Sequence, residues 1–113
     1  MITARLGECA GLLTLEMDGH AGSAPAGQDL VCAAASILCY TLVAQAGKLS
    51  ADGKLRAKPC VNLADGHAAI AIKPRGAAER EARAIWGTVE SGLLLLQRAH
   101  PDCIRVDSGE YPR

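Results

Sequence analysis

The sequence predicts an α+β fold, a single domain over residues 1–113 with the element order ββαββαβ, in which two helices pack against one antiparallel-rich sheet. Two pairs of short segments with alternating apolar residues, each pair joined by a turn, predict two hairpins. Two longer apolar segments have the lengths of helices, and a last short apolar run follows the second of them. A chain of 113 residues also fits one domain at roughly 150 residues per domain.

The first hairpin joins residues 2–7 to residues 13–17. In both segments apolar side chains alternate with polar or small ones, as in a strand with one buried side. The turn between them, residues 8–11, ends in a glycine, which accepts the positive φ of tight turns. Residues 18–28 contain three glycines and a proline, and we expect them to form a mobile loop.

The first helix is expected from Leu30 to Ala46. Asp29 stands directly before it and can cap the helix, because its carboxylate can accept a bond from an unpaired N–H of the first turn. Gly47 and Lys48 are typical of a helix C-terminus. The segment is apolar on nearly every side, so we expect this helix to be central and buried.

The second half repeats the pattern of a hairpin followed by a helix. Alternating runs flank the turn dipeptide Asp65-Gly66, and Pro59 places the strand before this turn at an edge of the sheet. Apolar residues recur every three or four positions over residues 77–99, which predicts an amphipathic helix. Residues 103–106 are expected to form the last strand.

Composition excludes several classes of function. Twelve basic and twelve acidic residues cancel, and the aromatic residues are one Trp, two Tyr and no Phe. We therefore expect no direct binding of nucleic acid, which uses positive charge and aromatic stacking. We find no apolar run of about 18 residues that would span a membrane and no signal peptide, so we expect no membrane association and a cytoplasmic location.

Five cysteines, an odd number without CxxC spacing, are expected to remain reduced thiols. Four of them are expected to be filler in a core of small side chains: Cys9, Cys39, Cys60 and Cys103. Cys32 is different, because it falls at the third position of the expected helix. A helix N-terminus favours a thiolate, and its unpaired N–H groups can stabilise an oxyanion.

His20 follows the second strand and can fold back toward Cys32 across the loop. An imidazole there can act as general base and acid for a thiol nucleophile, and this chemistry needs no metal and no cofactor. The alternative interpretation is structural, since a cysteine in an alanine-rich helix more often packs than reacts. The tetrapeptide Asp18-Gly19-His20-Ala21 recurs at residues 65–68, where no helix-start cysteine follows, so we interpret His67 as a turn residue.

The Gly-His-Ala after the second strand and the run Gly-Gln-Asp-Leu-Val-Cys-Ala-Ala-Ala-Ser over residues 27–36 resemble the signature of the ribosomal-processing cysteine protease Prp (YsxB-like) family. The resemblance implies that His20 and Cys32 are the catalytic pair, with Asp29 and Ser36 in supporting roles. It also implies a homodimer whose substrate is the precursor of large-subunit ribosomal protein twenty-seven, from which a short N-terminal extension is removed.

The residues alone leave some roles open. Asp29 could orient His20 or only cap the helix, and the Ser36 hydroxyl could contact the site or bond back to a helix carbonyl. Residues 21–28 are expected to act as a lid over the substrate. The alternative function is a non-catalytic, ribosome-associated binding module. A thiol redox protein is disfavoured, because Cys39 lies about 10 Å from Cys32 along a helix, too far to bridge.

Overall fold

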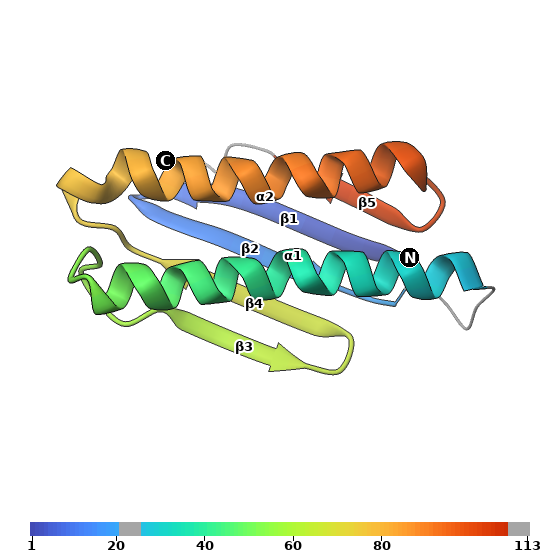
Figure 1. Ribbon diagram of the computed structural model, residues 1–113, viewed down its shortest axis with the longest axis horizontal. Helices are drawn as coiled ribbons and strands as arrows, with labels where there is room; N and C mark the ends of the chain where they lie inside the picture. Colours follow the sequence, from blue (N-terminus) through green and yellow to red (C-terminus); the bar gives the residue numbers. More distant parts are fainter. Residues whose placement is uncertain (21–25, 109–113) are drawn as a thin grey trace.

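Both helices lie on one side of the β-sheet in the computed structural model, which describes residues 1–20 and 26–108 (Figure 1). In these residues the elements are, in chain order, β1 (Ile2–Cys9), β2 (Leu12–Asp18), α1 (Ala26–Ala51), β3 (Cys60–Ala64), β4 (His67–Ile72), a 3-10 turn (Gly76–Ala78), α2 (Glu79–Ala99) and β5 (Ile104–Asp107). The predicted α+β fold and its ββαββαβ order are confirmed.

The five strands lie in the order β3-β4-β2-β1-β5. All neighbouring pairs are antiparallel except β1 and β5, which run parallel. The sheet is therefore mixed but mostly antiparallel, as expected, and β3 lies at an edge, as Pro59 predicts. The two hairpin turns have positive φ where tight turns require it, at Ala10 and Gly11 in the first and at Gly66 in the second.

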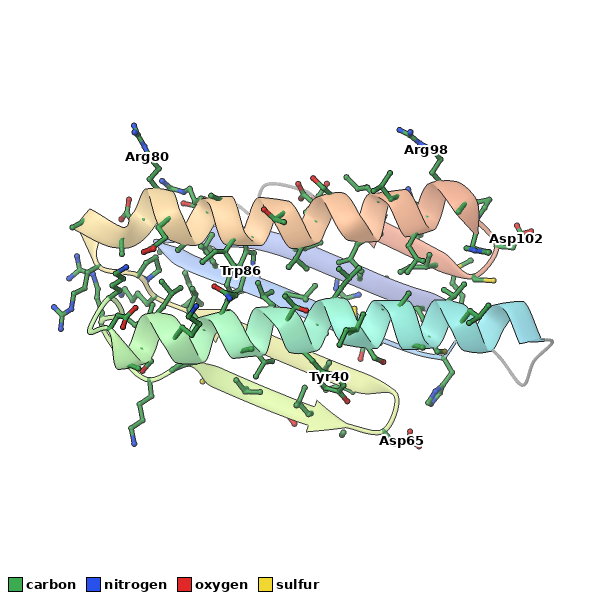
Figure 2. All side chains as sticks on the ribbon, in the orientation of Figure 1. Tyr40, Asp65, Arg80, Trp86, Arg98 and Asp102 are labelled. Carbon is green, nitrogen blue, oxygen red and sulfur yellow. The ribbon has the colours of Figure 1, made fainter. Side chains whose placement is uncertain are left out.

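The strands alternate between the two sides of the sheet. On β2, Leu13, Leu15 and Met17 are buried under the helices, whereas the residues between them face the uncovered side. The helix side forms the hydrophobic core together with inward residues of α1 and α2. Trp86 of α2 points into this core, and its Nε1 donates a hydrogen bond to the Thr14 carbonyl at 3.0 Å. Arg80 and Arg98 extend from α2 on the side away from α1 (Figure 2).

α2 is amphipathic, as predicted from the sequence. Ala82, Trp86, Val89 and Leu93 are buried at spacings of three and four residues. Acidic residues occupy its first turn and Arg98 its last, which complements the helix dipole. The amphipathic pattern of residues 77–99 thus gives the helix almost as predicted, with its first two residues in the 3-10 turn.

α1 is longer than predicted at both ends. It begins at Ala26, so Asp29 lies inside the helix and the predicted N-cap at Asp29 is wrong. It ends at Ala51, so Gly47 lies inside it as well. The C-terminus is closed by Gly53, which has a φ of +70°, with bonds from the Gly53 N–H to the Ser50 carbonyl and from the Lys54 N–H to the Leu49 carbonyl. These two bonds form a Schellman motif, for which a glycine with positive φ is well suited.

α1 is also less buried than predicted. Its inward residues, among them Leu42 and Ala46, are fully covered. Its outward side nevertheless carries large apolar side chains, and Leu30, Ile37 and Tyr40 are 70%, 60% and 54% exposed. The expectation of a helix buried on all sides is therefore wrong.

The expectation that no segment could span a membrane is wrong by length and composition. Residues Leu30–Ala51 form a 22-residue helical segment with a mean hydropathy of 1.8. One such helix is weak grounds for a membrane protein, because the core helix of a globular domain has the same composition. Here α1 packs on the sheet and on α2, where Gly92 lets the Leu38 side chain approach closely.

The cysteines divide by burial. Cys39 and Cys103 are buried, which confirms the prediction of core filler for these two. Cys9 and Cys60 are exposed, so the same prediction is wrong for them. The pairing explains Cys60, because it lies opposite Ala71, which faces the uncovered side of the sheet. Cys32 is half-buried.

Candidate active site

A cavity of about 420 Å³ opens between the N-terminal half of α1, the end of β2 and the turn between β3 and β4. His20, Cys32 and Ser36 all line it. The structure thus brings together three of the four residues singled out from the sequence. Apolar side chains form much of the remaining wall, among them Met17, Cys39 and Leu63.

The backbone around His20 is held on two sides. The Met1 nitrogen donates to the His20 carbonyl at 2.7 Å, and the Gly19 N–H donates to the Gly66 carbonyl at 2.9 Å. Gly19 has a φ of +98°, and a Cβ at this position would lie 2.3 Å from the Met1 carbonyl oxygen. Only glycine fits this bend, which turns the chain from the end of β2 toward the cavity.

The His20 imidazole lies against Gly66, in the turn between β3 and β4. A Cβ on Gly66 would lie only 2.6 Å from His20 Nε2. The positive φ of 73° favours glycine at this position, and the absence of a side chain leaves the space that the imidazole occupies. The turn between β3 and β4 therefore contacts the His20 imidazole at Gly66.

Cys32 lies on α1 six residues after Ala26, the first residue of the helix. The expectation that it sits in the first turn is wrong, because the helix begins earlier than predicted. The helix N–H groups without a partner in their own helix belong to the first turn. Cys32 therefore lies beyond the helix N–H groups that were expected to stabilise an oxyanion beside it. It shares the cavity with the His20 imidazole.

Of the two residues expected to have supporting roles, Ser36 and Asp29, the structure describes the side chain of Ser36 only. Ser36 is exposed and lines the cavity one turn after Cys32. Asp29 belongs to the helical backbone of α1, and its side chain lies outside the described part of the structure. Residues 21–25 of the expected lid also lie outside the described residues, whereas residues 26–28 belong to α1.

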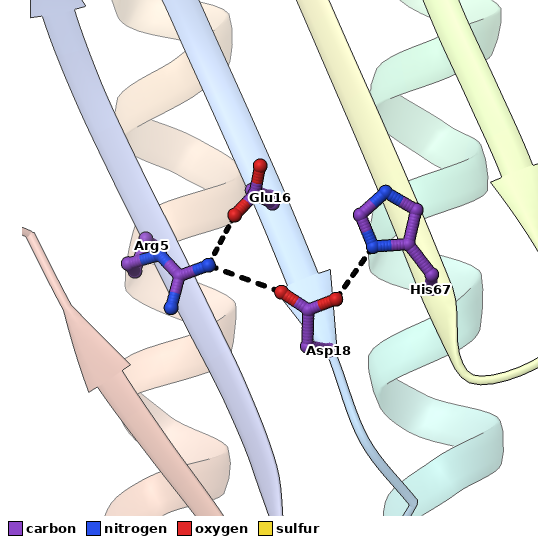
Figure 3. A network of polar contacts seen from close by, with 4 residues as sticks. All are labelled: Arg5, Glu16, Asp18 and His67. Atoms are coloured by element: carbon purple, nitrogen blue, oxygen red, sulfur yellow. Dashed lines mark hydrogen bonds and ion pairs between the residues drawn. The ribbon is translucent and has the colours of Figure 1, made fainter.

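A polar network on the uncovered side of the sheet reaches the cavity through His67, which is one of the lining residues (Figure 3). His67 Nδ1 lies 2.5 Å from one carboxylate oxygen of Asp18, and Arg5 Nη2 lies 3.0 Å from the other. Arg5 also pairs with Glu16. The hydrogen bond from His67, together with the positive charge of Arg5, holds the pKa of Asp18 below its ordinary value.

Sequence reasoning identified the second Asp-Gly-His-Ala tetrapeptide but not the contact of His67 with Asp18. The signal was present, because each copy has a histidine at its third position. What the sequence alone could not supply was the register of β2 on β4, which puts Asp18 opposite His67.

The cavity therefore combines a thiol with an imidazole in a lining of both apolar and polar residues. These are the parts of a cysteine protease, in which an imidazole takes the proton of the attacking thiol. The sequence model of the family described as "Cysteine protease Prp" matches residues 1–105. The chain belongs to the Prp family and is a cysteine protease.

Solved structures of Prp proteases have the same fold as this chain. The chain is 26% identical to the essential ribosomal processing protease Prp from S. aureus, crystallised with a substrate peptide, with a TM-score of 0.71 and coverage of 96% of this chain and 100% of that one. A second structure of the S. aureus protease, with a covalently linked product peptide, gives a TM-score of 0.68 at the same identity and coverage. SMU.848 from Streptococcus mutans is also 26% identical, with a TM-score of 0.69 and coverage of 98% and 96%. A comparison with curated proteins gives no match.

Proposed function

We propose that the chain is a ribosomal-processing endopeptidase in which Cys32 is the nucleophile and His20 the general base. Its proposed substrate is the precursor of large-subunit ribosomal protein twenty-seven, which loses its N-terminal extension. One observation carries the proposal: His20 and Cys32 line the same cavity in a chain of the Prp family. The similar S. aureus protein, described as a ribosomal processing protease, supports the choice of substrate class.

The proposed reaction has two stages. Cys32 Sγ attacks the scissile carbonyl carbon while His20 accepts the thiol proton. The C–N bond then breaks, His20 gives the proton to the departing amine, and a thioester remains on Cys32. Water, deprotonated by His20, hydrolyses the thioester and restores the thiol. A covalent intermediate of this kind agrees with the covalently linked product peptide of the S. aureus protease.

Ser36 and Asp29 have supporting roles in this proposal. Ser36 lies at the wall of the cavity, one helical turn beyond the nucleophile. For Asp29, which lies within α1, we propose the role of orienting His20. We expect Asp29→Asn and Ser36→Ala to reduce cleavage without abolishing it.

Variants at the catalytic pair test the proposal directly. Cys32→Ala and His20→Ala are each expected to reduce cleavage of the extended ribosomal precursor by about 10³-fold or more, measured by mass spectrometry of the products. Cys60→Ala is the matched control, because it removes an exposed thiol on β3 outside the cavity lining and should leave the rate unchanged. Full activity of Cys32→Ala would overturn the assignment of the nucleophile.

We also propose that the protease is a homodimer. The outward side of α1 and the edge strand β3 support this, because Ile37 and Val61 are exposed apolar side chains outside the cavity lining. Such side chains are typically covered at interfaces. Ile37→Asp is expected to shift the protein to a monomer in sedimentation analysis, with Ile37→Leu as control. A monomeric wild-type protein at micromolar concentration would contradict the proposal.

A cytoplasmic location is proposed from the cysteines. Cys39, Cys60 and Cys103 form no disulfide, and reduced thiols persist in the cytoplasm. Fractionation of cells followed by immunodetection tests this, and recovery of the protein in the membrane fraction would contradict it.

A further inference from the structure

We propose that His67 is a positioning residue for proteolysis, because it locks the turn between β3 and β4 against the end of β2 and so fixes the support under the His20 imidazole. The inference rests on the catalytic role proposed above for His20. It gives a function to the second Asp-Gly-His-Ala tetrapeptide, at residues 65–68.

The first contact joins Asp18, the last residue of β2, to His67, the first residue of β4, which lies opposite it in the sheet. A carboxylate only accepts hydrogen bonds, so the 2.5 Å contact makes Nδ1 of His67 the donor. Arg5 of β1 holds the other carboxylate oxygen (Figure 3). With both oxygens bound from opposite sides, the carboxylate is fixed in orientation and so is the His67 ring.

The next contact transmits this constraint to the turn. One residue beyond Asp18 and one residue before His67, the Gly19 N–H donates to the Gly66 carbonyl at 2.9 Å. The ladder of β2 on β4 is thereby continued past the end of β2. Movement of His67 away from Asp18 would loosen this bond and let the turn move.

The turn between β3 and β4 contacts the His20 side chain directly. Gly66 lies so close to Nε2 of His20 that the space for a Cβ is already filled by the imidazole. On the other side, the Met1 backbone holds the His20 carbonyl. A shift of the turn therefore changes where the imidazole rests in relation to Cys32, and a displacement of about 1 Å at a catalytic group can cost up to about 100-fold in rate.

The two copies of the tetrapeptide thus have complementary roles. In the first, the histidine follows a glycine with positive φ and reaches the cavity. In the second, Gly66 supports that histidine, while His67 binds the aspartate of the first copy. The site is built from two similar turns that contact each other at their glycines.

The test compares three variants of His67 in the full-length protein. His67→Ala is expected to lower kcat about tenfold with KM near the wild-type value, because a displaced base slows the chemistry and not the binding. His67→Asn should recover kcat to within about threefold, since its amide nitrogen lies near the place of Nδ1 and can donate to Asp18. His67→Phe keeps a ring of similar size but has no donor, and it should behave as His67→Ala.

Controls separate this role from stability and from the proposed function. His100→Ala removes an exposed imidazole at the end of α2 and should leave kcat unchanged. A purely structural role would lower the melting temperature of His67→Ala or His67→Phe while the folded protein kept its kcat, and that result would overturn the proposal. Failure of folded His67→Asn to recover kcat would also overturn it.

The variant Cys32→Ala distinguishes the two levels of inference. If Cys32→Ala is inactive while His67→Phe retains wild-type kcat, only the positioning role fails. If Cys32→Ala is active, the proposed function itself fails. If His67→Ala does not fold, His67→Phe and His67→Asn decide the question alone.

Discussion

The two sides of the sheet are built for different purposes. On the side covered by α1 and α2, the strands present aliphatic residues that form the core. On the uncovered side, polar side chains form a network that reaches the candidate active site: Arg5, Glu16, Asp18 and His67. Because successive residues of a strand point to opposite sides, β2 serves both purposes at once. Stability and site geometry are therefore carried by alternate residues of the same strand.

The largest expected effect comes from neighbouring residues on β2. Leu15 is 1% exposed under the helices, and Leu15→Ala should lower the free energy of unfolding by about 3 kcal/mol through lost burial and a cavity. Glu16→Ala, on the opposite side, should change it much less, because exposed ion pairs contribute little. Urea denaturation of both variants measures the difference. Similar losses for the two would contradict the division between the sides.

Two cysteines give a second, smaller contrast. Cys39 of α1 lies on the covered side, and burial raises the pKa of its thiol, whereas Cys60 of β3 is exposed. Since the thiolate is the reactive form, iodoacetamide near neutral pH should alkylate Cys60 at least about tenfold faster than Cys39. Peptide mapping by mass spectrometry measures both rates in one sample. Equal rates would mean that the core opens readily over Cys39.

The smallest expected effect is a pH dependence on the uncovered side. The folded-state pKa of Asp18 lies below its ordinary value of 3.8, chiefly because His67 donates to the carboxylate. Its contribution to stability is therefore present above pH 3.8 and is lost as the pH falls through the lower, folded-state pKa. The melting temperature of Asp18→Asn should approach that of the wild type below pH 3.8, and the difference should be greatest above it.

The control for this experiment is Asp102→Asn, an exposed aspartate in the turn before β5. It should show no comparable dependence over the same pH range. A difference between wild type and Asp18→Asn that stays constant with pH would show that the loss comes from geometry and not from charge.

The sequence predicted the elements whose signals are local. The hairpins followed from alternation and from Asp65-Gly66, and α2 followed from its apolar spacing. The predicted start of α1 was wrong because a favoured cap residue such as Asp29 can also lie inside a helix, and α1 already begins at Ala26. Its end was wrong because Gly47 and Gly53 both suit a C-terminus, and only the bonds at Gly53 decide between them.

The site was predictable where its residues stand alone in the sequence and not where it depends on pairing between strands. His20 and Cys32 were identified from residue types and order, and they do line one cavity. The support of His20 by Gly66 and the bond of His67 to Asp18 depend on the register of β2 and β4, which brings together residues 49 positions apart. The exposure of Cys9 could have been predicted, because the alternation in β1 puts it on the side of Arg5.

Trp86 gives the protein an internal fluorescent reporter. It is the only tryptophan in the chain, and its indole is buried in the core with its N–H bonded to the Thr14 carbonyl. Unfolding exposes the ring to water and shifts its emission to longer wavelength. Among the described residues, Trp86 lies outside the cavity lining, so the emission follows the state of the core and is little affected by a peptide in the cavity. Each variant can therefore be checked for folding in the same cuvette in which its activity is measured.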